Sequence, residues 1–316
     1  MFDAYTRRHR DQRRIKDADQ TEFEAILRGN AVVDRGIYDD RVADALDDYD
    51  PQGAQDMESW HRSDLMIDSA VGQIHEEIER RDGLLGQAYP FRLDDGLLTY
   101  EKSKSGFYEF CLAISLADQI TTGEHAQLPR AFERLSTILV RSYFGEGARG
   151  LHLGTPRDAD VGARFRDAMK RAHEETKEWF WGPDPGLPVE PSDTGDHGVD
   201  FVVWKAPPDS RPGSLFILGQ CACGDDWASK FDDVNLDRYK KWFNLLTFVP
   251  PVRAFATPHH VSDGFLHEAL KLAGLMFDRG RLTLAAETAC DAEDYRSWAG
   301  RIADLTRLVV PIANAA

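Results

Sequence analysis

Apolar positions recur along the chain at two different periods, and they separate a helical first part from a mixed second part. Helical spacing of apolar residues predicts helices over 1–30, 57–81 and 106–120, with a turn-rich stretch at 83–98. The same spacing predicts further helices at 128–144, 161–181, 236–247, 261–278 and 292–310. Short apolar runs bounded by turn residues predict strands at 148–154, 199–204, 214–219, 252–257 and 281–286.

This order of elements predicts the fold class and its division. Helices and strands that alternate after residue 128 are typical of an α/β core, in which helices flank a central mixed sheet. We therefore expect a helical N-terminal region over 1–125 and an α/β domain over 126–316, with a helical insertion at about 158–182.

The strands at 199–204 and 214–219 are separated by a turn rich in Pro and Gly, which predicts a β-hairpin. Asp200 opens the first strand and Gln220 follows the second. Pairing across the turn would bring both side chains to the same end of the hairpin. Carboxylate and amide oxygens are ligands that Mg²⁺ and Mn²⁺ accept, so the hairpin predicts a metal site at Asp200 and Gln220.

From residue 128 to about residue 260, the chain resembles the PD-(D/E)XK, or restriction-endonuclease-like, nuclease superfamily. Asp200, in GVDFVVW, is similar to the metal-binding aspartate of the superfamily, and Gln220, in FILGQCAC, is similar to the acid of its (D/E)xK motif. Glu133, in FERL, stands where many members carry a supporting glutamate. Ala222 departs from the pattern, because it occupies the position of the lysine. Lys230, in DDWASK at the start of the next helix, is expected to replace that lysine.

The resemblance implies a restriction-endonuclease-like core and a metal-dependent nuclease that acts on DNA, with RNA not excluded. Asp200, Gln220 and Glu133 would hold Mg²⁺ or Mn²⁺, and Lys230 would orient the attacking water. The resemblance also implies a role in bacterial defence against phage or plasmids. The helical N-terminal region would then form a homodimer or bind a partner protein. Because the lysine is missing at Ala222, the alternative is a catalytically inactive binding or assembly subunit of a defence complex.

Charge restricts how such a protein could bind nucleic acid. The chain has 38 Lys and Arg residues against 54 Asp and Glu residues, a net charge of −16. This excess counts against nonspecific phosphate binding, so a nuclease needs a local basic surface. The basic residues in and near the insertion are the candidate surface: Arg149, Arg157, Arg164, Lys170 and Arg171. A second basic cluster, between Arg7 and Lys16, is more typical of a solvated helix.

Four cysteines leave one further class of enzyme open. None has the CxxC spacing of a structural zinc site. Cys221 and Cys223 could pair with His259 or His260 in a thiol hydrolase or a metal site, although small buried thiols at a strand end are the simpler interpretation. His152 is expected to be structural.

Localisation is predicted from two further patterns. No apolar run approaches the roughly 18 residues that a membrane span needs. The basic N-terminus is not followed by an apolar segment, so it does not resemble a secretory signal. The small number of cysteines indicates a reducing compartment. We therefore expect a cytoplasmic protein.

Overall fold

The computed structural model describes most of the chain in nine ranges. These ranges are 2–33, 57–159, 161–162, 164–181, 198–209, 211–231, 234, 243–245 and 249–311. Within them, the side chains of 2–10, 57–68, 166, 179–181 and 243–245 are left out of the description. In the described helices, no segment is both long enough and apolar enough to cross a bilayer.

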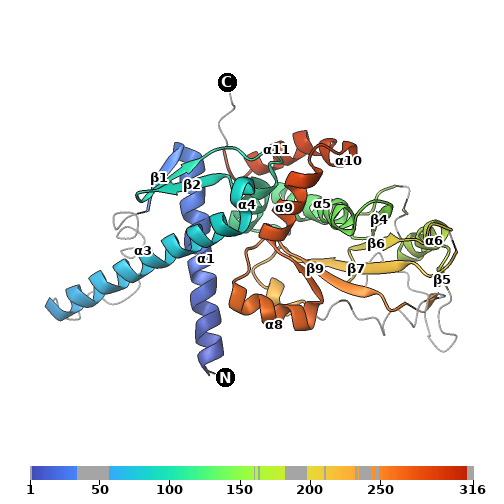
Figure 1. Cartoon of the computed structure of the whole chain (residues 1–316), viewed down its shortest axis with the longest axis horizontal. Helices are drawn as coiled ribbons and strands as arrows, with labels where there is room; N and C mark the ends of the chain where they lie inside the picture. Colours follow the sequence, from blue (N-terminus) through green and yellow to red (C-terminus); the bar gives the residue numbers. More distant parts are fainter. Residues whose placement is uncertain are drawn as a thin grey trace.

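A five-stranded mixed sheet forms the centre of the α/β part (Figure 1). Its strands, in spatial order, are β10 (Leu275–Phe277), β9 (Val252–Ala256), β7 (Leu215–Cys221), β6 (Phe201–Lys205) and β4 (Ala148–His152). The pairs β4–β6 and β6–β7 are antiparallel, whereas β7–β9 and β9–β10 are parallel. Along the chain, helix α5 (Gln127–Phe144) comes first and β4, β6, β7 and β9 follow. The predicted α/β class and the hairpin are therefore confirmed.

Side-chain alternation along the strands assigns each face of the sheet to its own helices. In β6, Phe201 and Val203 pack with α5 and with three other helices, α4 (Phe107–Leu116), α9 (Arg279–Ala289) and α11 (Ala299–Arg307). Val202 and Trp204 point to the opposite face, where they pack against α6 (Phe165–Thr176). Helix α8 (Asp263–Ala273) covers the β9 and β10 side of that second face. Figure 1 shows α5 and α9 on one side of the sheet and α8 on the other.

The N-terminal part contains two long helices, α1 (Phe2–Arg28) and α3 (Met57–Leu85), and a small sheet. In this sheet β3 (Leu97–Tyr100) lies between β1 (Asn30–Val32) and β2 (Phe91–Asp94), and all pairs are antiparallel. The stretch 83–98, predicted as turn-rich, therefore also contains the strand β2 and the start of β3. Asp95 and Gly96 form the tight turn with φ values of +45° and +78°, and this conformation is the one that a two-residue hairpin turn requires.

One hydrophobic core runs across residue 125, where the sequence predicted a domain boundary. Phe107 and Phe110 of α4 share a buried cluster with Leu128 and Phe132 of α5 and with Phe201 of the sheet. The division at residue 125 stays a prediction, but the two sides of it are packed together.

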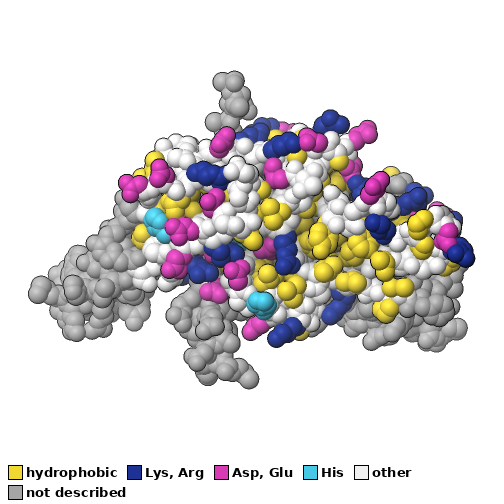
Figure 2. Space-filling view, viewed as in Figure 1, with side chains coloured by type: hydrophobic (Ala, Val, Ile, Leu, Met, Phe, Trp, Pro, Cys, Tyr) yellow, Lys and Arg dark blue, Asp and Glu magenta, His cyan; other side chains and the backbone are white. Residues whose placement is uncertain are grey.

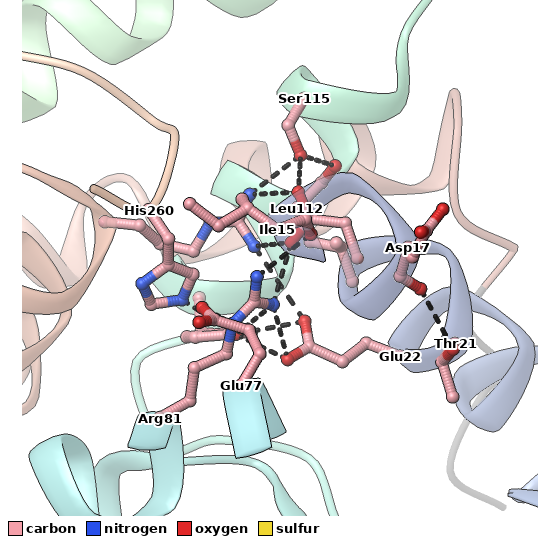
Figure 3. A network of polar contacts seen from close by, with 12 residues as sticks. Ile15, Asp17, Thr21, Glu22, Glu77, Arg81, Leu112, Ser115 and His260 are labelled. Carbon is pink, nitrogen blue, oxygen red and sulfur yellow. Dashed lines mark hydrogen bonds and ion pairs between the residues drawn. The ribbon is translucent and has the colours of Figure 1, made fainter. Parts of the chain in front are cut away.

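A buried polar cluster fixes α1 against the rest of the molecule (Figure 3). The Arg279 guanidinium donates two hydrogen bonds to Asp19, of 2.9 and 2.8 Å. Arg81 donates to both Asp19 and Glu22, each at 2.8 Å. Burial by itself would raise the pKa of Asp19, but the guanidiniums of Arg279 and Arg81 hold that pKa below its ordinary value. The first helix is therefore joined by charge pairs to α3 and to the start of α9.

Several predicted elements in the last third differ from the structure. The predicted strand 281–286 lies inside helix α9, which begins where the Asp278 side chain accepts a hydrogen bond from the Arg281 amide. The predicted helix 261–278 ends at Ala273, because Gly274 adopts a left-handed φ of +80° and β10 follows.

Two more predicted helices are shorter or interrupted. The predicted helix 161–181 is α6, which ends at Thr176, and residues 179–181 form β5 (Trp179–Trp181). β5 pairs with β8 (Phe243–Leu245), so the predicted helix 236–247 is wrong at 243–245. The other residues of that prediction lie outside the described ranges. The closing helix 292–310 is divided into α10 (Glu293–Arg296) and α11.

Candidate functional site

Asp200 and Gln220 lie at the same end of the β6–β7 hairpin. Phe201 pairs with Gly219 in the last pair of the register, Asp200 directly precedes Phe201, and Gln220 directly follows Gly219. The Asp200 amide donates to the Gly219 carbonyl at 2.8 Å, and the Asp200 Oδ2 accepts a hydrogen bond from the Cys221 amide at 2.6 Å. Both side chains are buried, with 8% and 5% of their residues' surfaces exposed. The two predicted residues therefore lie at the same end of the hairpin.

Glu133 approaches the same strand ends from the other layer. It lies on α5, which covers the opposite face of the sheet, and its Oε2 is 3.1 Å from the Nε2 of His152 at the end of β4. A Cβ atom built on Gly154 would overlap this Oε2 atom, so the Glu133 carboxylate rests directly over the backbone of residue 154. The sequence predicted a structural role for His152 and none for Gly154. Their contact with Glu133 depends on how α5 packs on β4, which no local pattern specifies.

The segment after β4 contacts both carboxylate residues. The amides of Leu153 and Gly154 donate to the backbone carbonyl of Asp200, at 2.6 and 2.9 Å. His152 binds Glu133 from the same segment. Residues 152–154 therefore hold Asp200 through its backbone and Glu133 through its side chain.

Two thiols, those of Cys221 and Cys223, lie close enough to Asp200 and Glu133 for these carboxylates to change the pKa values of the thiols. Burial raises the pKa of Cys221 well above its ordinary value, and the negative charges of Asp200 and Glu133 raise it further. Burial likewise raises the pKa of Cys223, and Glu133, Cys111 and Asp200 add to that effect. Both carboxylates therefore act on the same two thiols, which stay protonated at neutral pH.

Lys230 lies beyond these cysteines, after a single 3₁₀ turn at Trp227–Ser229. The sequence placed it at the start of a helix, but residue 230 directly follows this turn and most of the helix predicted beyond it is outside the described ranges. Its ammonium group forms an ion pair with Asp226 Oδ1 at 3.1 Å. The charge of Lys230 lowers the pKa of Cys223 slightly against the larger raising effects, so the lysine is within electrostatic range of the site strand. Ala222 is buried among the side chains packed under α8.

The basic residues predicted to bind phosphate are partly paired with acidic neighbours. Arg171 pairs with Glu175 at 2.7 Å and Arg149 lies 3.9 Å from the same carboxylate. Arg164 and Lys170 are exposed and Arg157 is half-buried. Figure 2 shows Lys and Arg side chains interspersed with Asp and Glu side chains on the face that it displays. These pairs reduce the local positive charge that the sequence predicted.

The basic cluster near the N-terminus is also paired where its side chains are described. Arg14 lies 3.5 Å from Glu77, and Lys16 binds Asp225 at 3.1 Å. The side chains of Arg7 to Arg10 are outside the description. This supports the interpretation of the cluster as a helix surface.

The histidines near the two thiols bind other atoms. His259 Nε2 contacts the backbone oxygen of Cys223 at 2.9 Å, and His260 Nε2 contacts the hydroxyl of Tyr108 at 3.0 Å. A nucleophilic cysteine needs a base within hydrogen-bond reach of its sulfur and a lowered pKa. Here the two histidines bind other atoms, and the pKa values of Cys221 and Cys223 are raised. The thiol-hydrolase alternative is therefore not supported.

A cavity of about 440 Å³ lies next to the site strand. It is bounded by α1, by the end of α4 and by the loop that follows β7, including Cys223, Gly224 and Asp225. Across the described part of the chain, no group of three or more His, Cys, Asp and Glu side chains is arranged to hold a metal ion. The metal ligands that the sequence predicted are two carboxylates and one amide, and their role stays a prediction.

Comparison with known proteins gives one structural likeness. No family model and no curated protein matches the chain. Among solved structures, the chain is similar to the MspJI restriction endonuclease in complex with a 27-mer oligonucleotide, with 16% identity and a TM-score of 0.30. The alignment covers 59% of this chain and 33% of that one, so the chain spans about a third of the length of its neighbour.

Proposed function

We propose that this chain is a metal-dependent nuclease with a restriction-endonuclease-like core, and that it hydrolyses phosphodiester bonds in DNA. The observation that carries the proposal is the position of Asp200 and Gln220 at the same end of the β6–β7 hairpin. Glu133 supports it, because it reaches the same strand ends from α5, the helix that precedes the hairpin's sheet.

The donor atoms of this group fit a hard divalent cation. Asp200 and Glu133 offer carboxylate oxygens, and Gln220 offers an amide oxygen, which are the ligand types of Mg²⁺ and Mn²⁺. The neighbouring thiols do not compete as ligands, because burial and the two carboxylates raise the pKa of Cys221 and Cys223. A metal bound there would polarise the phosphodiester and activate water.

The chain's own residues would orient this chemistry. The Cys221 amide donates to Oδ2 of Asp200 and so fixes the orientation of this carboxylate. Gln220 stands on the neighbouring strand, and its neutral amide adds no charge, so we expect weaker metal affinity than a third carboxylate would give. Lys230 would stabilise the charge on the phosphate and orient the water once it exchanges Asp226 for the substrate.

Cleavage of plasmid and single-stranded DNA in Mg²⁺ or Mn²⁺ tests the proposal. We expect cutting that requires the metal, is lost in Asp200→Ala and is strongly reduced in Lys230→Ala. Matched controls are Asp304→Ala and Lys271→Ala, which change exposed residues of α11 and α8. Cutting that persists in Asp200→Ala would refute the assignment of the site. RNA of the same sequence distinguishes the two nucleic acids.

A second function is favoured by one specific observation. Ala222 occupies the position of the lysine in the motif, and the replacement, Lys230, is paired with Asp226. A nuclease-like subunit that binds without cutting would show this arrangement. Wild-type protein that binds DNA or a partner protein, yet cuts no substrate in either metal, would select this second function. A defence role, a homodimer and a cytoplasmic location stay predictions.

A further inference from the structure

We infer that His152 is a positioning residue that holds the Glu133 carboxylate in the orientation needed for metal binding. This inference rests on the proposed function, because it assigns Glu133 to the metal. His152 lies at the end of β4, and its register partner on β6 is Phe201, the residue next to Asp200. The histidine is therefore one residue pair away from the principal carboxylate while it contacts the second one.

The hydrogen bond between the two side chains has a defined direction. An ionised carboxylate only accepts hydrogen bonds, so the Nε2 atom of His152 donates to Glu133 Oε2 across 3.1 Å. His152 is 6% exposed, and its Nδ1 atom is buried with no hydrogen-bond partner in the described part of the chain. Glu133 is then the polar group that holds the ring.

This contact uses one carboxylate oxygen and leaves the other for a ligand. A glutamate side chain on a helix has three rotatable bonds, so an unrestrained Glu133 would sample many orientations around α5. With Oε2 held by His152, the Oε1 atom takes a fixed direction. Groups that orient a metal-binding side chain in this way are worth about 10- to 100-fold in metal affinity.

Gly154 provides an independent route to the same carboxylate. A Cβ atom at this position would overlap Glu133 Oε2 and lie 2.9 Å from His152 Nε2. Gly154→Ala would therefore displace the carboxylate while both polar side chains remain. The amides of Leu153 and Gly154 also bind the Asp200 backbone carbonyl, so this short segment contacts the backbone of Asp200 as well as the side chain of Glu133.

The test is the affinity of the full chain for Mn²⁺ alone, measured by titration calorimetry or by the loss of the free Mn²⁺ resonance signal. We expect wild type to bind, Asp200→Ala to lose binding, and His152→Ala to bind about 10-fold more weakly or worse. His152→Gln keeps a donor near the position of Nε2, so it should bind within about threefold of wild type. Gly154→Ala should resemble His152→Ala. The matched controls His267→Ala and Gly83→Ala change exposed helix residues and should bind as wild type does.

Each result has a distinct meaning. Equal Mn²⁺ affinity in His152→Ala and wild type would overturn the inference and leave the nuclease proposal intact. If His152→Gln is as weak as His152→Ala and both unfold at the wild-type temperature, the donor has no positioning role and the inference fails. Absence of Mn²⁺ binding in wild type would overturn the metal site itself, and the inference with it. Cleavage provides a second readout, because His152→Ala should need about 10-fold more Mg²⁺ for half-maximal cutting while its rate at saturating Mg²⁺ stays near that of wild type.

Discussion

Replacing Gly219 by alanine should destabilise the protein, because this glycine has an aromatic ring above it. Gly219 pairs with Phe201 across the β6–β7 hairpin, immediately next to Asp200 and Gln220. A Cβ atom at 219 would overlap the Cζ, Cε1 and Cε2 atoms of the Phe201 ring, and Phe201 is fully buried. The ring cannot turn into solvent, so it must shift within the packed layer beneath α5.

The size of the effect follows from two opposing terms. Overpacking a buried position costs about 1–3 kcal/mol. Alanine restricts the unfolded chain more than glycine does, which returns about 0.4–1 kcal/mol. We expect a net loss of about 1–2 kcal/mol in the free energy of unfolding. At about 2–4 °C per kcal/mol for chains of 150–250 residues, the melting temperature should fall by several degrees.

Thermal and urea unfolding of four proteins would measure this effect: wild type, Gly219→Ala, Phe201→Leu and the double variant. The smaller leucine removes the overlap, so the double variant should lose less stability than the sum of the two single losses. Gly83→Ala is the control, because its Cβ atom would enter open space on a helix and should raise stability by up to about 1 kcal/mol. A Gly219→Ala protein as stable as wild type, with additive single effects, would refute the packing of Phe201 on Gly219.

Two further predictions concern the buried charges and thiols. Asp19→Ala leaves the guanidinium of Arg279 buried without its carboxylate, so urea unfolding should show a loss of about 3–5 kcal/mol in the free energy of unfolding. A loss under about 1 kcal/mol would mean that the cluster is hydrated or rearranges. Because burial raises the pKa of Cys223, its thiolate fraction at pH 8 is very small, so a maleimide should label the half-buried Cys290 first and reach Cys223 only when the chain unfolds. Equal labelling rates at the two cysteines in folded protein would contradict the burial of Cys223.

The hairpin and its two polar residues could be predicted from sequence because the signals are local. Apolar runs bounded by Pro and Gly predicted both strands, and their antiparallel pairing sets Asp200 and Gln220 at the same end of the hairpin. The β2–β3 hairpin carried a local signal as well, the Asp95–Gly96 turn between two short strands. The stretch was predicted as turn-rich, but its two strands, of four residues each, were not predicted.

The remaining differences depend on contacts between distant residues. The segment 281–286 has the length and apolar content of a strand, yet it is helical because Asp278 caps α9 and Arg279 is held by Asp19 from the first helix. The contact of His152 with Glu133 requires α5 to lie on β4, and sequence spacing alone does not supply that packing. Local patterns therefore predicted the strands that carry the site, but not the side chains that orient it.

The buried pair of Asp19 and Arg279 has a consequence for synthesis of the chain on the ribosome. The two residues are 260 positions apart. At a translation rate of about 5–20 residues per second, Arg279 follows Asp19 by roughly 13–50 s. During this interval Asp19 and Glu22 can pair with Arg81, which is made early, but the second guanidinium is still missing. The first helix therefore reaches its final position late, and a nascent chain that stops before residue 279 leaves this helix incompletely docked and exposed to chaperones and proteases.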